Sequence, residues 1–267
     1  MSHNNDHTAD LVRRDADELV VAMVEPSQSA YHLGLVVTAH AITAVLASAI
    51  LALVLSQNLS TPPMAPFWAA VVVLTPIMAS EPIRRREKPQ KFGHANRITL
   101  VRAVIVSGFV CLTNSAPGPK IATLAAAVAI IALILDGLDG WVARRTHSTS
   151  EYGAQLDMEL DSIFMLVLAI LVFVWGHAGP WVLFCGLARY GWLVISHLIS
   201  WFNRPLPPSF RRKTACVVGV GSLALALAPW PWPFLNSGLS VVATSALFIS
   251  FAIDASWLIQ RKSEPLP

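Results

Sequence analysis

Eight long apolar runs dominate this sequence of 267 residues and limit what it can fold into. Hydrophobic residues make up 55% of the chain and charged residues only 13%, whereas soluble domains contain about 25% charged residues. Each run is close to or above the ~17 residues that a membrane-spanning helix needs. The runs lie at about residues 31–55, 64–80, 98–115, 119–136, 161–176, 179–200, 214–229 and 239–259. The sequence therefore predicts an all-α, polytopic membrane helical bundle with eight spans.

The polar segments between these runs divide the chain into four parts. Residues 1–30 form a polar tail, residues 31–80 hold two spans, residues 81–95 are a charged linker, and residues 96–260 form one membrane domain with six spans. In the tail, residues 8–23 are compatible with a short amphipathic helix on the membrane surface, and a partly disordered tail is the alternative. Because the tail is polar and carries acids, it does not match a cleavable signal peptide, and the first span is expected to act as the insertion signal.

The basic residues predict how the bundle is oriented. With eight spans both termini lie on one side of the membrane, and sixteen of the 19 Lys and Arg residues fall on that side. By the positive-inside rule this side is the cytoplasm. We therefore expect an integral, multi-pass protein of a bacterial-type cytoplasmic (inner) membrane, with the tail and the linker in the cytoplasm.

The segment 136–161, DGLDGWVARRTHSTSEYGAQLDMELD, places four aspartates at fixed distances from small residues and one arginine. At about 100° per residue, the first five of the eight residues share one helical face and the last three share a face of a second helix. The eight are Asp136, Asp139, Gly140, Ala143, Arg144, Gly153, Asp157 and Asp161. If the turn at residues 146–150 folds the two helices against each other, the four carboxylates converge.

Four neighbouring carboxylates at a membrane boundary need a compensating cation, since like charges raise one another's pKa. Oxygen-only ligands favour a hard ion such as Mg²⁺ or Mn²⁺ over zinc. Hard ions held by carboxylates usually serve phosphate chemistry, and Arg144 on the same face suits a phosphate oxygen. The pattern therefore predicts a divalent metal site that handles phosphate groups.

The spacing Asp-x2-Asp-Gly-x2-Ala-Arg-x8-Gly-x3-Asp-x3-Asp resembles the signature of the CDP-alcohol phosphotransferases (CDP-alcohol phosphatidyltransferases), and all eight fixed positions match. These are integral membrane enzymes of phospholipid synthesis with a six-span helical core, and the resemblance covers residues 92–260. It implies transfer of a phosphatidyl or similar substituted phosphate group from a CDP-alcohol, such as CDP-diacylglycerol, to an alcohol acceptor, with release of CMP. It also implies a homodimer in the lipid bilayer and no nucleic-acid partner. The first two spans lie outside this core, as accessory spans without an assigned role.

The resemblance assigns roles to the motif. Asp136, Asp139 and Asp157 are expected to hold two Mg²⁺ or Mn²⁺ ions, with Asp161 as a further ligand and as the base that accepts the proton of the acceptor hydroxyl. Four residues are expected to surround CDP because their size or charge permits close approach: Gly140, Ala143, Arg144 and Gly153.

Three polar residues at the start of the third span, Asn96, Thr99 and Arg102, share one helical face in a pattern similar to the start of the family core. In the family this helix end lies beside the nucleotide, so Asn96 and Thr99 are expected to help bind it. The alternative is that Asn96 and Thr99 are ordinary helix caps and that Arg102 extends to the membrane interface.

Basic residues further along suggest where the acceptor binds. Arg189 is a cation inside a span, and family members that use glycerol 3-phosphate or inositol phosphate carry basic residues near this position; pairing with an aspartate of the cluster is the alternative. Arg211 and Lys213 lie in a stretch that partly resembles one of phosphatidylglycerophosphate synthases, although Phe210 replaces a glycine and Arg211 a lysine. A positive-inside anchor explains the same charges. Glycerol 3-phosphate is the predicted acceptor, and serine, inositol phosphate and choline remain open.

Other functions agree less well with the sequence. An ion-coupled transporter would place its acids near the membrane midplane and show internal repeats, whereas these acids cluster at one edge and no repeat is visible. A scaffold that has lost catalysis would not need all four aspartates. There is also no Walker loop, Rossmann glycine fingerprint or GxSxG elbow, which argues against an ATPase, a dehydrogenase or an esterase. Asp254, in the last span, is expected to make a structural contact.

Overall fold

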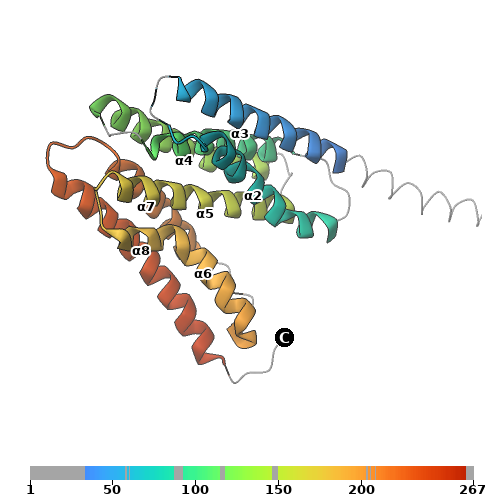
Figure 1. Cartoon of the computed structure of the whole chain (residues 1–267). Helices are drawn as coiled ribbons and strands as arrows, with labels where there is room; N and C mark the ends of the chain where they lie inside the picture. The colour runs from blue at the N-terminus through green and yellow to red at the C-terminus, as the bar shows by residue number, and fades with distance from the viewer. Residues whose placement is uncertain are drawn as a thin grey trace, which may run out of the picture.

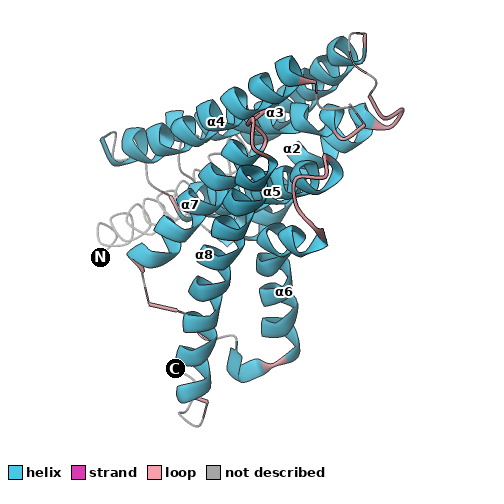
Figure 2. Cartoon of the chain, turned by 90° about the vertical axis from the view of Figure 1, so that its left-hand side faces the viewer, coloured by secondary structure: helices cyan, strands magenta, loops and turns pink. Residues whose placement is uncertain are grey.

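The computed structural model describes residues 34–57, 59, 61–86, 93–114, 118–145, 150–202, 204, 206–207 and 209–262. Over these residues the fold is helical and contains no strand, which confirms the predicted all-α class (Figures 1 and 2). The elements are a first helix Gly34–Ser56, α2 (Ala65–Arg86), α3 (His94–Gly108) with the 3-10 helix η1 (Phe109–Leu112), α4 (Pro119–Arg145), α5 (Glu151–Val174), η2 (Pro180–Leu183), α6 (Phe184–Leu198), η3 (Ser200–Phe202), α7 (Phe210–Ala226) and α8 (Pro233–Gln260). The predicted tail and most of the charged linker lie outside the described residues.

Six of these helices are long and apolar enough to cross a membrane: the first helix, α2, α3 with η1, α4, α6 with η2, and α8. The other two differ for identifiable reasons. Helix α7 has 17 residues, at the lower limit for a span, and α5 carries four acidic residues in its first half, Glu151, Asp157, Glu159 and Asp161. The chain is thus a multi-pass membrane protein, and these four acids lie on a helix that is not among its six candidate spans.

Helix α5 lies at the centre of the bundle and packs against α2, α3, α6 and α7. Most of its residues from Leu160 to Val172 are buried by the other helices, and Leu160, Leu168 and Leu171 are fully buried. Ser150 caps its N-terminus by accepting a hydrogen bond of 2.9 Å from the backbone N–H of Gly153. A helix surrounded by protein can carry charged side chains where their partners are supplied by neighbouring helices.

Helix α3 contacts the two helices that carry the aspartate motif. It packs against both α4 and α5, whereas α4 packs mainly on α3 and α7. The sequence predicted that the carboxylates of the two motif helices converge if the turn at residues 146–150 folds these helices together. Carboxylates of α4 and α5 do meet in the structure. What the motif did not indicate is that α3 packs against both helices and contributes its own side chain to their meeting point.

Helices α6 and α8 lean away from the remaining helices at one end of the bundle (Figures 1 and 2).

Helix α2, from the predicted accessory pair, packs along α5 and α3. The first helix joins it through a small cluster formed by Ala52, Ala65, Ala69 and Cys111. Helix α2 therefore supports α5, which carries part of the motif, and α3.

Candidate active site

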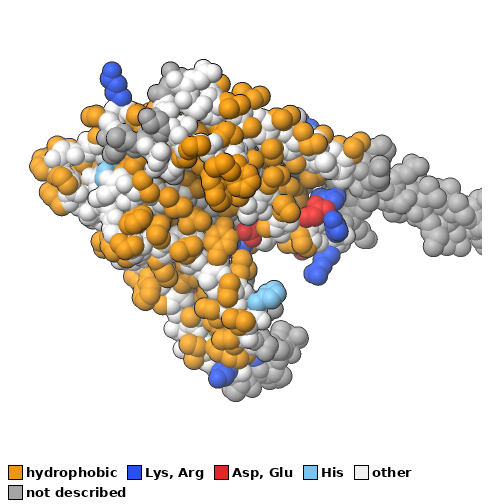
Figure 3. Space-filling view, in the orientation of Figure 1, with side chains coloured by type: hydrophobic (Ala, Val, Ile, Leu, Met, Phe, Trp, Pro, Cys, Tyr) orange, Lys and Arg blue, Asp and Glu red, His pale blue; other side chains and the backbone are white. Residues whose placement is uncertain are grey.

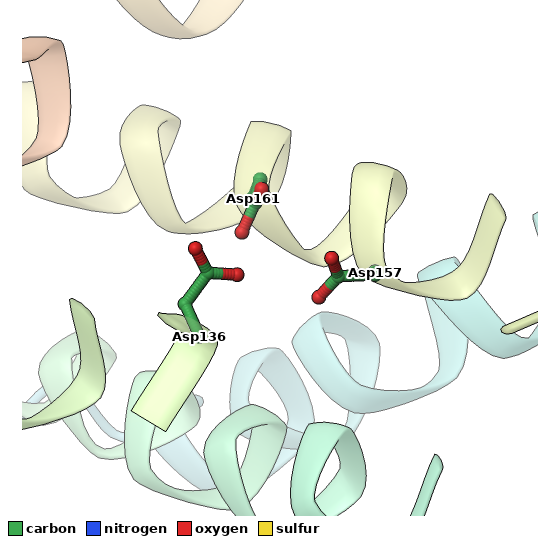
Figure 4. A group of neighbouring side chains, drawn as sticks. All are labelled: Asp136, Asp157 and Asp161. Atoms are coloured by element: carbon green, nitrogen blue, oxygen red, sulfur yellow. The ribbon is translucent and has the colours of Figure 1, made fainter. Parts of the chain in front are cut away.

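Three of the four motif aspartates meet in space. Asp136 comes from α4, and Asp157 and Asp161 lie one turn apart on α5, so that their carboxylates point toward one another (Figure 4). One carboxylate oxygen from each lies within 4.8 Å of the others. Asp139 follows Asp136 by one turn of α4, but its side chain lies outside the described part, as do those of Ala143 and Arg144.

Arg102 of α3 lies at the centre of these three carboxylates, which we call the aspartate triad. Its side chain is 0% exposed, and it donates hydrogen bonds to Oδ1 of Asp157 (2.5 Å), to Oδ1 of Asp161 (3.0 Å) and to Oδ1 of Asp136. The alternative that Arg102 extends to the membrane interface is therefore wrong. The helical pattern correctly placed it on the face of Asn96 and Thr99, but gave no sign that this face meets the triad.

The charges of the triad are only partly balanced within the described residues. Since the oxygens lie within 4.8 Å of one another, two of these carboxylates repel each other by roughly 3 kcal/mol or more at an effective dielectric constant of about 20. One guanidinium offsets one of the three negative charges and leaves the group with two. The candidate ligand atoms are all oxygen, as hard divalent ions prefer. The donor set of the triad therefore fits a hard divalent ion.

Two of the predicted nucleotide residues that the structure describes, Asn96 and Gly153, contact each other. Asn96 and Thr99 are buried, and the Thr99 hydroxyl donates to the carbonyl of Ala95 at 3.1 Å. Asn96 lies against Gly153 at the start of α5, and a Cβ atom at position 153 would be 2.6 Å from Asn96 Oδ1. The absence of a side chain at Gly153 was predicted to make room for the nucleotide. In the structure, Asn96 occupies part of this space. Gly140 is half-buried on α4.

The substitution Gly153→Ala tests whether this close approach matters for nucleotide binding. The added methyl group would meet both Asn96 Oδ1 and the Ser150 hydroxyl, 3.1 Å away, and would displace the Asn96 side chain. We expect the KM for the CDP-alcohol to rise by about tenfold or more, because a misplaced polar contact typically costs about 1–2 kcal/mol. Asn96→Ala should raise the same KM. An unchanged KM for the CDP-alcohol in both variants would show that Asn96 and Gly153 do not contribute to nucleotide binding.

A cavity of about 500 Å³ lies beside the triad, between α5, α6, α7 and α8. Figure 3 shows a hollow in this region, where acidic and basic side chains appear next to a largely apolar surface. Its walls are mostly apolar, with Met158, Met165, Trp192 and Phe251 among them. Asp161 belongs to the lining, so one carboxylate is shared by the triad and the cavity.

The three predicted acceptor residues are placed differently. Arg189 lines the cavity and forms an ion pair with Glu159, a buried acid that also accepts a hydrogen bond of 2.6 Å from Gln155. Arg211 pairs with Asp254 at 2.5 Å and donates to the Ser250 hydroxyl at 2.8 Å, so it links α7 to α8. Lys213 is exposed and is not among the residues that line the cavity.

Three charged residues in or next to this cavity were not assigned to the site from the sequence: Glu159, Arg212 and Asp254. Glu159 lies between two motif acids in the sequence and was given no role of its own. On α5 it lies on a different face from Asp157 and Asp161. Arg212 lines the cavity, donates to the carbonyl of Pro207 at 2.5 Å and lies 3.4 Å from Asp254. Asp254, expected to be structural, is buried and pairs with both Arg211 and Arg212, which confirms a contact between helices but also places it in the lining.

The fold and the site define an integral membrane protein with a candidate hard-metal centre next to a cavity. A sequence model of one family, described as CDP-alcohol phosphatidyltransferase, matches residues 92–253, more than half of the chain. The chain belongs to this family. Members are transferases of substituted phosphate groups in phospholipid biosynthesis and generally use divalent metals. No curated protein and no solved structure matches the chain.

The family match confirms the resemblance seen in the motif. It spans α3 to most of α8, includes the triad, Arg102 and every residue that lines the cavity except Asp254, and leaves the first helix and α2 outside. Membership in the phosphatidylglycerophosphate synthase-like subgroup stays a prediction.

Proposed function

We propose that this protein transfers a phosphatidyl or similar substituted phosphate group from a CDP-alcohol, such as CDP-diacylglycerol, to an alcohol acceptor and releases CMP. Family membership supplies the reaction class. The observation that carries the proposal further is the position of Asp161, which belongs both to the aspartate triad and to the lining of the cavity. An acceptor hydroxyl in the cavity would reach the same carboxylate that helps hold the phosphate-bound metal.

In this reaction Asp161 accepts the proton of the acceptor hydroxyl as its oxygen forms a bond to the phosphorus distal to cytidine. The bond between that phosphorus and the oxygen of CMP breaks, so CMP leaves with the electron pair. A carboxylate at the edge of a largely apolar cavity has direct access to the hydroxyl, which a general base requires. Of the three hydrogen bonds from Arg102 to the triad, the one to Asp161 is the longest, at 3.0 Å.

Asp136, Asp157 and Asp161, with Asp139 on the next turn of α4, would hold Mg²⁺ or Mn²⁺, in keeping with a site for two ions. Such ions supply charge compensation for the pyrophosphate as negative charge shifts to the leaving group. Gly140, Ala143 and Arg144 on α4 and Gly153 on α5 are proposed to surround the cytidine diphosphate, next to Asn96 and Thr99 of α3. This arrangement puts the scissile phosphate between the triad and the cavity.

The cavity is proposed to bind the acceptor, and glycerol 3-phosphate is the first candidate. Arg189 and Arg212 line it and offer guanidinium groups to a phosphate. Arg211 and Lys213 lie on the same helix as Arg212 and stay secondary candidates for this role. A second class, a zwitterionic acceptor such as serine, is favoured by the pairing of both lining arginines with acids, Glu159 and Asp254. A zwitterion can use one member of each pair without leaving net charge in the cavity.

A panel of acceptors tests the proposal. Purified protein is incubated with CDP-diacylglycerol, Mg²⁺ and, in turn, glycerol 3-phosphate, serine, inositol phosphate, choline or glycerol, and CMP release is measured. We expect release with one anionic or zwitterionic acceptor and loss of release in Asp161→Asn. Activity with glycerol alone would contradict the anionic and zwitterionic assignments. No release with any acceptor, while the protein is folded, would contradict the proposed reaction.

The orientation and assembly of the protein belong to the same proposal. The excess of Lys and Arg on the side of the motif supports an active site that faces the cytoplasm at a bacterial inner membrane. CDP-linked substrates are made in the cytoplasm, so the proposed orientation agrees with the proposed chemistry. A homodimer is proposed from family membership.

A further inference from the structure

Arg102 occupies the position that ties the active-site helices together. It comes from α3 and donates to carboxylates on two other helices, to Asp136 on α4 and to Asp157 and Asp161 on α5. Its side chain is 0% exposed, whereas those of the three aspartates are 23%, 35% and 25% exposed. Because α3 packs against both α4 and α5, this one guanidinium connects the two halves of the motif.

The geometry of these contacts suits arginine alone among the basic residues. The guanidinium is planar and has several N–H donors in fixed directions, so it can bond to three carboxylates at once. All three of these hydrogen bonds use Oδ1 of the aspartate, and each carboxylate has a second oxygen. Lysine would supply the charge but only a single nitrogen, and a neutral side chain would leave three partly buried like charges without their central cation.

We propose that Arg102 is a positioning residue that assembles the aspartate triad before the metal arrives. This inference rests on the metal site of the proposed function. In the metal-free protein Arg102 holds the aspartates of α4 and α5 at ligand distance and offsets part of their repulsion. Arg102 and the metal therefore stabilise the same arrangement of helices. Without Arg102, the stability of the fold should depend strongly on the metal.

Thermal unfolding of the purified protein, with chelator or with saturating Mn²⁺, tests this inference. In the metal-free state Arg102→Met should lower the Tm by roughly 10 °C, as expected when one partner of a buried ionic group is removed. Mn²⁺ should then restore most of the loss, so that the Mn²⁺-induced rise in Tm is larger in the variant than in the native protein. Arg102→Lys keeps the charge without the fork of donors and should show the same behaviour with smaller shifts.

Arg211→Met is the matched control, because Arg211 also pairs with a buried aspartate, Asp254, but away from the triad. This variant should lose stability, and Mn²⁺ should raise its Tm only as much as that of the native protein. If Arg102→Met is purified only with Mn²⁺ present, its unfolding on addition of chelator supports the inference, and Arg102→Lys provides the quantitative comparison.

Two results would overturn the inference. In the first, Mn²⁺ raises the Tm of the native protein and raises the Tm of Arg102→Met by no more than that. This result would reject the role of Arg102 but leave the metal site intact. A native protein that Mn²⁺ does not stabilise at all would reject the metal site of the proposed function and, with it, this role.

Discussion

Replacing Asp157 with Asn is expected to reduce CMP release by about 10³-fold or more while the protein stays folded in the membrane. The carboxylate of Asp157 belongs to the triad and contacts Arg102 at 2.5 Å. An amide of the same shape lacks the charge that a hard divalent ion requires, and the loss of several kcal/mol of charge stabilisation corresponds to about 10³-fold in rate. The amide oxygen of the substituted side chain can still accept a hydrogen bond from Arg102, so we expect little loss of stability.

Glu151→Gln is the matched control, since Glu151 is an exposed acid on the same helix, at its first turn. It changes the net charge by the same amount as Asp157→Asn and should retain native turnover. Both variants are compared for CMP release and for Tm in detergent. Native turnover in Asp157→Asn would refute the assignment of Asp157 to the metal.

A second large effect is expected at the contact between α5 and α6. Gly186 of α6 lies so close to α5 that a Cβ atom there would be 2.3 Å from Leu166 Cα and 2.5 Å from Leu166 Cβ. Leu166 lies in the middle of a packed helix and cannot move alone, so Gly186→Ala must push the two helices apart. Overpacking of this kind costs about 1–3 kcal/mol or more, and we expect the Tm to fall by roughly 5–10 °C.

The same substitution should also weaken acceptor binding. Gly186 lines the cavity one turn before Arg189, and separating α6 from α5 would disturb the ion pair of Arg189 with Glu159. We expect a higher KM for the acceptor with a smaller change in the KM for the CDP-alcohol. Gly191→Ala, on the same helix with no atom within 4 Å of the added Cβ, should leave both KM values and the Tm close to native. If Gly186→Ala and Gly191→Ala have the same Tm and the same KM values, the α5–α6 contact does not influence the cavity.

The sequence predicted the faces of the helices well, because that information is local. The spacing of Asp157 and Asp161 is enough to put both on one side of a helix, and the structure has them there. The same periodicity placed Asn96, Thr99 and Arg102 on one face of α3. The apolar runs likewise predicted the all-α membrane fold, since their lengths depend on the thickness of a bilayer.

Which faces meet could not be predicted, because this depends on contacts between residues far apart in the chain. Arg102 bonds to Asp136 and Asp157, which are 34 and 55 residues away. The motif itself gave no reason to expect that α3 packs against both α4 and α5 at this point. For the same reason Arg189 was recognised as an intramembrane cation, while its partner Glu159 on α5 was not.

Gly153 shows a third limit of prediction from a motif. A glycine beside a predicted nucleotide site is naturally expected to make room for the ligand. In the structure its missing side chain makes room for Asn96, whose Oδ1 would lie 2.6 Å from a Cβ at this position. Space near a glycine can serve a neighbouring side chain, and only the packing of α3 against α5 identifies which one.

The central claim is that the aspartates of α4 and α5 hold divalent ions at one site. Its most direct test is the anomalous scattering of manganese in crystals of the protein grown with Mn²⁺. We predict a peak within coordination distance of carboxylate oxygens of Asp136, Asp157 and Asp161, and its loss in Asp157→Asn. A catalytically active protein whose manganese binds elsewhere, or whose three carboxylates contact no ion, would contradict the account.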